Sequence, residues 1–197
     1  MFSNGISKHI TSALRAESRN DFSGAIKHYK KILKSSLKKT AKIEVLNNIG
    51  VLYFRLKKYK KAGSLFKKCL RYDKKDSKLW NNLGLCYYKT GKKQMAKTAY
   101  QKAISIDDKF FDAYMNLTNL FCDMNKFKQA LKTGKKLLKI NPLNPEVLYG
   151  IGKIYLKLKN NKKAIFYFEA SLSIKLDYEP ALLELVSMYF DMGKHND

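Results

Sequence analysis

Residues 80–103, WNNLGLCYYKTGKKQMAKTAYQKA, carry the pattern that decides the fold. Large, small and aromatic residues stand here at offsets 0, 3, 4, 7, 16, 20 and 23, namely Trp80, Leu83, Gly84, Tyr87, Ala96, Tyr100 and Ala103. The pattern recurs every 34 residues, starting again at Leu46, Tyr114 and Leu148. A fixed period of this length predicts one helix–turn–helix unit that is copied and stacked.

The repeated residue types have a packing role. Glycine at offset 4 and alanine at offset 16 let the two helices of a unit approach closely, while the aromatic side chains fill the space between neighbouring helices. Gly134 breaks the pattern, because the other full repeats place an aromatic residue there. We expect Phe127 and Leu131 to lean into the resulting space and Gly134→Ala to stabilise this repeat.

These residues resemble the tetratricopeptide repeat, whose pattern is a large apolar residue, Leu, Gly or Ala, Tyr, then Ala, an aromatic residue and Ala. The resemblance implies an all-α, right-handed α-solenoid of five repeats plus a C-terminal half repeat. Within a single domain over residues 1–197, the repeats are predicted at 6–42, 43–76, 77–110, 111–144 and 145–178, with a terminal helix at 179–194. Three extra residues in the degenerate first repeat are expected near 35–40.

Composition excludes several classes of function. The chain has no 18-residue apolar run and no signal peptide, so a cytoplasmic protein is expected. No catalytic grouping, cofactor motif or metal-ligand spacing is visible, which predicts no enzyme activity, no cofactor and no metal. Cys69, Cys86 and Cys122 match no disulfide framework and are interpreted as small core residues in a reducing compartment.

The family resemblance implies that the first helix of each repeat lines a concave groove for an extended peptide or partner helix. Asn48, Asn82 and Asn116 stand 34 residues apart at one groove place and resemble the asparagine ladder of peptide-binding members. An asparagine amide both donates and accepts, which suits the backbone of an extended peptide. The other groove candidates are Asn47, Asn81, Asn119, Phe54, Lys78, Tyr88, Met115, Tyr149 and Lys153. The alternative is that these amides satisfy local groups and the aromatic rings pack between helices.

Charge leaves a second hypothesis open. The formal net charge is +24, and all but four of the 40 basic residues are lysines. The alternatives are a solvated lysine surface, or a basic scaffold whose convex face docks an acidic macromolecule such as nucleic acid or an anionic membrane. Lysine lacks the planar fork that reads bases, so any nucleic-acid binding is expected to be weak and non-specific. A helper domain of a longer multidomain enzyme is a third alternative.

The terminal helix from Glu179 is apolar around most of its circumference. A surface helix is normally apolar over a single stripe, so part of this helix is expected to stay exposed. An exposed apolar patch predicts either a homodimer through the C-terminal helix or docking of a partner there.

Overall fold

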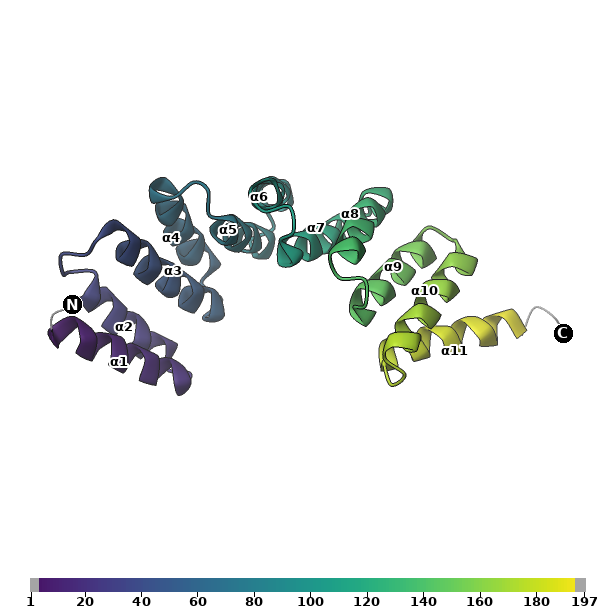
Figure 1. Cartoon of the computed structure of the whole chain (residues 1–197), viewed down its shortest axis with the longest axis horizontal. Coiled ribbons are helices and arrows are strands. Elements are labelled where there is room, and N and C mark those ends of the chain that lie inside the picture. Colours follow the sequence, from purple (N-terminus) through teal and green to yellow (C-terminus); the bar gives the residue numbers. More distant parts are fainter. Residues whose placement is uncertain (1–3, 194–197) are drawn as a thin grey trace. The chain divides into compact units, whose positions relative to one another are not determined.

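The computed structural model describes residues 4–193, and within that range all regular secondary structure is helical (Figure 1). The helices are α1 (Asn4–Ser18), α2 (Phe22–Ile32), α3 (Lys39–Arg55), α4 (Tyr59–Tyr72), α5 (Ser77–Lys89), α6 (Lys93–Ile106), α7 (Phe111–Asp123), α8 (Phe127–Ile140), α9 (Pro145–Lys157), α10 (Asn161–Ile174) and α11 (Glu179–Gly193). This confirms the prediction of an all-α repeat fold. The predicted last residue of the terminal helix, Lys194, lies outside the described range.

Helices pair in chain order. The odd-numbered helices α1 to α9 are the first helices of the repeats, and each packs against the second helix that follows it. The three extra residues of the first repeat are absorbed at the α2–α3 connection, where α3 begins at Lys39, four residues before the repeat boundary predicted at residue 43.

The turn between the two helices of each repeat uses one residue with a positive φ. These residues are Asn20, Lys57, Gly91, Asn125 and Lys159, with φ between 56° and 75°. A left-handed residue at a helix C-terminus reverses the chain, and glycine or asparagine adopts that conformation at the lowest cost. Two of the five turns therefore hold a lysine, Lys57 or Lys159, in a backbone conformation that is strained for a residue with a side chain.

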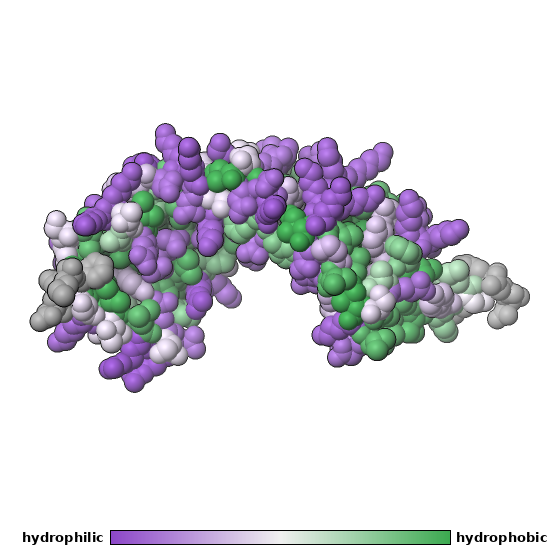
Figure 2. Space-filling model, in the orientation of Figure 1, coloured by the Kyte–Doolittle hydropathy of each residue, from purple (hydrophilic) through white to green (hydrophobic). Residues whose placement is uncertain are grey.

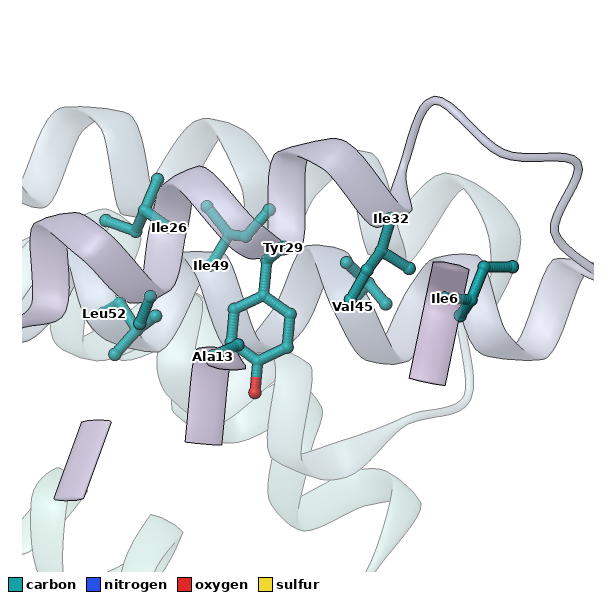
Figure 3. Close-up of a cluster of buried hydrophobic side chains, with 9 residues drawn as sticks. Ile6, Ala13, Ile26, Tyr29, Ile32, Val45, Ile49 and Leu52 are labelled. Atoms are coloured by element: carbon teal, nitrogen blue, oxygen red, sulfur yellow. The ribbon is translucent and has the colours of Figure 1, made fainter. Parts of the chain in front are cut away.

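The chain divides into two compact units, residues 1–108 and residues 109–197. In unit 1, α1, α2 and α3 enclose a cluster of buried aliphatic side chains around Tyr29 (Figure 3). The cluster contains Ile6, Ala13, Ile26, Ile32, Val45, Ile49 and Leu52, with Ala25 completing it. A neighbouring core forms under α3, α4 and α5 around Phe66 and Leu79. A single domain over the whole chain stays a prediction.

The small offset-4 residue faces the aromatic ring sixteen residues later. A Cβ atom built on Gly84 would lie 2.5 Å from the ring of Tyr100, and the pair Gly152 and Phe168 shows the same distance. Gly50 repeats the arrangement with its own ring partner at 2.7 Å. Glycine is thus required at these places because any side chain would overlap the ring.

The fourth repeat, in unit 2, reverses this size pairing. Thr118 occupies the offset-4 place and faces Gly134. A Cβ atom built on Gly134 would lie 3.3 Å from Cγ1 of Ile151 and 3.8 Å from Cγ2 of Thr118. The space above Gly134 is therefore closed by Ile151 and Thr118, and the expectation that Phe127 and Leu131 lean into it is wrong.

The cysteines are core residues, as predicted from their spacing. Cys69 and Cys86 are buried and Cys122 is half-buried, all as free thiols. Burial raises the pKa of the Cys86 thiol to about 12 and that of Cys69 to about 11. A thiol kept protonated in this way is a poor nucleophile and metal ligand.

Candidate functional site

In unit 1 the first helices α3 and α5 contact each other and share a small apolar pocket. The pocket has a volume of about 80 Å³ and is lined by Val51, Phe54, Phe66, Asn82 and Leu85. Asn82 is the one polar residue in this lining, and the surface that the pocket exposes is entirely apolar. An apolar depression of this kind suits an apolar side chain of a ligand.

The other asparagines of unit 1 take part in the structure of the unit itself. Asn48 is half-buried and hydrogen-bonds Tyr29, whose hydroxyl donates to Glu17 over 2.8 Å. Burial, followed by the interactions with Glu17, raises the pKa of Tyr29 to about 12. Asn81 is only 5% exposed. The side-chain oxygen of Asn47 is enclosed and has no hydrogen-bond partner among the described residues.

The remaining candidates of unit 1 lie at the surface. Lys78 is exposed on the first turn of α5, and Tyr88 is half-buried on the last turn of the same helix. The ammonium group of Lys89 lies 5.7 Å from the centre of the Tyr88 ring. Phe54 packs edge-on against Tyr59, with ring centres 5.1 Å apart. Phe54 and Asn82 are therefore brought together at the pocket, while Lys78 and Tyr88 lie outside its lining.

Unit 2 holds a larger pocket between its first helices α7 and α9. Its volume is about 400 Å³. The lining consists of Asn119, Cys122, Asp123, Asn125, Phe127, Gly150, Lys153, Ile154 and Lys157. Gly150 occupies the place that asparagine fills in the three preceding repeats, and a Cβ atom built there meets nothing within 4 Å. Gly150 therefore faces open space, with Lys153 and Lys157 in the same pocket lining.

Lys153 is held in place at this pocket from two sides. Its ammonium group forms an ion pair with Glu184 of α11 and lies 5.9 Å from the centre of the Tyr149 ring. The hydrogen bond to Glu184 raises the pKa of Lys153, while partial burial opposes the shift. Tyr149 packs against Phe168 and Tyr178, each with ring centres 5.7 Å apart. Lys153 is therefore a fixed positive charge in the pocket wall.

Not every predicted residue of unit 2 reaches the pocket. Asn119 is exposed and lines it together with Lys153, whereas Met115 and Asn116 are half-buried one turn earlier on α7 and lie outside the lining. Phe127 also lines this pocket, although it was not among the groove candidates predicted from the sequence. The available signal was Gly150 itself, because a glycine in a helix, at a place otherwise held by asparagine, marks missing side-chain volume.

The described residues 4–193 lack a metal-binding cluster and a membrane-spanning helix. No group of three or more His, Cys, Asp or Glu side chains in that range is arranged to hold a metal ion. No described helix combines the length and the apolar composition needed to cross a membrane.

Paired helices at a 34-residue period, with pockets between successive first helices, define a helical-hairpin repeat protein. Family models of the tetratricopeptide repeat match residues 43–76, 77–110 and 145–178, and a further model of the same repeat matches residues 118–159. Together these matches cover well over half of the sequence, so the chain belongs to the tetratricopeptide repeat family. No curated protein matches it.

Several solved structures share the fold. A MamA crystal structure is 25% identical, with a TM-score of 0.77, and the alignment covers 90% of this chain and 97% of that one. MamA from Desulfovibrio magneticus RS-1 gives a TM-score of 0.78 at 14% identity, covering 91% of this chain and 99% of that one. YrrB, described as a TPR protein with an unusual peptide-binding site, gives 0.71 at 22% identity and covers 89% of each chain. The family and fold are those of a protein-interaction scaffold.

Proposed function

We propose that this protein is a non-catalytic adaptor that binds an extended segment of a partner along the first helices of its repeats. The observation that carries the proposal is the pocket around Gly150, where missing side-chain volume, an amide and fixed positive charge occur together. Concave pockets with a few convergent polar groups are the usual sites of ligand binding.

The pocket in unit 2 suits an acidic residue of the partner. Lys153 and Lys157 place two ammonium groups in its wall, and Asn119 adds an amide. The ion pair with Glu184 fixes Lys153 without closing the pocket. Because Gly150 has no side chain, a ligand backbone can approach α9 closely, as ligands do at glycines elsewhere. Asp123, in the same pocket wall, carries a negative charge, which favours a ligand that also has a hydrogen-bond donor.

The pocket in unit 1 suits an apolar side chain. Val51, Phe54 and Leu85 form the depression, and Asn82 offers both a donor and an acceptor to the adjacent ligand backbone. We infer that Asn82 and Asn116 act in backbone recognition within their own units. Asn48 belongs to the proposed ladder as well, although its bond to Tyr29 uses part of its hydrogen-bonding capacity.

The proposal is tested with a peptide selected from a random display library on the full-length chain, followed by fluorescence anisotropy. Gly150→Leu adds a side chain whose Cβ atom meets nothing within 4 Å, and it should weaken peptide binding by about tenfold. Asn82→Ala removes one hydrogen bond with a net value of about 1 kcal/mol. Lys136→Leu, at an exposed position of α8, is the matched control and should leave binding unchanged. Equal affinities for the wild type, Gly150→Leu and Asn82→Ala would contradict the proposal.

A second candidate function rests on a basic pocket of unit 1. Its volume is about 160 Å³, and Lys60, Lys67 and Lys92 lie in its lining beside Tyr59 and Tyr87. No acidic residue contributes to this lining, so the pocket attracts anions. Retention on a heparin column should fall after substitution of the three lysines with glutamine, with binding of the selected peptide unchanged. Unchanged retention on the heparin column would show that these three lysines are simply solvated and do not form an anion-binding site.

A further inference from the structure

The C-terminal end of the described chain differs in charge from the rest of the protein. Between Ala164 and Gly193 there are five acidic residues and one basic residue, in a chain whose formal net charge is +24. The helix α11 has no lysine or arginine, and it contains Glu179, Glu184 and Asp191. Glu184 is paired with Lys153. Since charges are screened beyond about 8 Å at physiological ionic strength, a ligand at this helix experiences mainly Glu179 and Asp191 among the acidic groups of α11.

The same helix exposes a large apolar surface. Only Ala181, Leu185 and Met188 of α11 are buried, on the side that packs against α10. The exposed apolar residues are Leu182 (48%), Leu183 (61%), Val186 (59%), Tyr189 (50%), Phe190 (63%) and Met192 (49%). Hydrophobic residues gather over α10 and α11 on the face of unit 2 drawn in Figure 2.

The exposed residues form a stripe of their own. Leu182, Val186 and Tyr189 are separated by four and three residues, so they share one side of a 3.6-residue helix. Leu183 and Phe190 broaden that side, and Glu179 lies above it on the first turn. An apolar stripe of this width normally contacts another element of the fold. Here it is available to a second helix.

The length and the charges of α11 indicate what kind of helix can bind to its exposed stripe. α11 has 15 residues, which corresponds to about 22 Å, so a helix of similar length can lie along it. An antiparallel pair of α11 helices from two copies would place Glu179 of one copy at the C-terminal end of the other, where the charged residue of α11 is Asp191, and like charges repel. A basic helix avoids that repulsion and gains favourable pairs at both ends.

We propose that α11 is a docking surface for an amphipathic helix of a partner protein, apolar on the face that contacts Leu182, Leu183 and Val186 and lysine- or arginine-rich beside it. The bound helix lies along α11 and covers the stripe, while its cations lie beside Glu179 and Asp191. This site is distinct from the first-helix pockets, because Val186 and Leu183 do not contribute to either of them.

The test uses two synthetic helical peptides of about 18 residues with the same leucine stripe, one with lysine and one with glutamate at the flanking positions. Anisotropy with the full-length chain should show that the lysine peptide binds and that Leu183→Gln with Val186→Gln weakens it by about tenfold. Leu143→Gln, at a 75% exposed site outside α11, is the matched control and should have no effect.

Charge provides the second arm. Glu179→Gln with Asp191→Gln should weaken the lysine peptide several-fold and reduce its salt dependence. The glutamate peptide is attracted by the lysines elsewhere, so its binding should not respond to the α11 variants. The proposal is overturned if the affinity of the lysine peptide is the same for the wild type and both double variants, or if the affinity of the glutamate peptide also depends on α11. It is also overturned if sedimentation shows that the chain dimerises through α11.

Discussion

The reversed pair Thr118 and Gly134 makes a quantitative prediction about packing in unit 2. In three other repeats a glycine faces an aromatic ring sixteen residues later, at a distance that excludes any side chain on the glycine. We predict that Thr118→Gly and Gly134→Tyr each destabilise the protein, whereas together they restore the arrangement of the neighbouring repeats.

The magnitudes follow from the contacts. Thr118 is 7% exposed, and its hydroxyl donates to the carbonyl of Tyr114 over 2.8 Å. Removing its buried methyl group costs about 1 kcal/mol, and glycine within a helix costs about 0.5–1 kcal/mol more. Gly134→Tyr alone forces a ring against Thr118 and Ile151, and such overpacking costs about 1–3 kcal/mol. The sum of the two single losses is therefore about 2.5–5 kcal/mol.

The double variant, Thr118→Gly with Gly134→Tyr, should lose much less stability than the sum of the two single losses, because the ring at residue 134 then fills the volume left at residue 118. We expect a favourable coupling free energy of about 1–2 kcal/mol, measured as a double-mutant cycle from urea unfolding followed by circular dichroism. Gly84→Thr with Tyr100→Gly is the inverse swap in unit 1 and should also couple favourably. Additive losses in both cycles would refute the idea that the two residues compensate each other in size.

Two further predictions concern local stability. Partial burial and the charges of Lys31 and His28 lower the pKa of His9, whose Nδ1 lies 3.3 Å from that of His28. A histidine with a lowered pKa contributes stability that is complete above pH 6.5 and is lost as the pH falls towards its folded-state pKa. The melting temperature should therefore drop between pH 7.5 and pH 5.0 by more in the wild type than in His9→Gln. Lys159→Gly, which copies Gly91 at a positive φ, should raise the free energy of unfolding by roughly 1 kcal/mol in a urea titration, and a decrease would contradict the assigned turn.

The repeat architecture was predictable because it depends on a pattern that occurs several times. Each copy of the 34-residue unit places a small residue, an aromatic residue and a turn at the same offsets, so the helix pairs could be assigned before the structure was known. The filling of the space at Gly134 was not predicted correctly. That error came from treating Gly134 as a single anomaly, although Thr118 breaks the pattern sixteen residues earlier and lies opposite it.

The candidate sites were predictable only in part, because a repeat position specifies the side of a helix and not the neighbours that cover it. Asn81 and Asn82 are adjacent in sequence, yet Asn81 is buried and Asn82 lines a pocket. Tyr149 occupies a groove place and packs against Phe168 and Tyr178 instead of standing alone. Such outcomes depend on contacts between repeats, which differ from one repeat to the next.

The charge of the whole chain likewise differs from the charge of its individual surfaces. The net charge of +24 favours anionic partners for the whole chain, but six exposed large hydrophobic side chains lie on α11, a helix whose charged residues are all acidic. A partner that recognises α11 must therefore differ in charge from one that recognises the pocket around Lys60 and Lys67. If both surfaces are used, binding at the two should respond in opposite directions when lysines in a partner are replaced by glutamates.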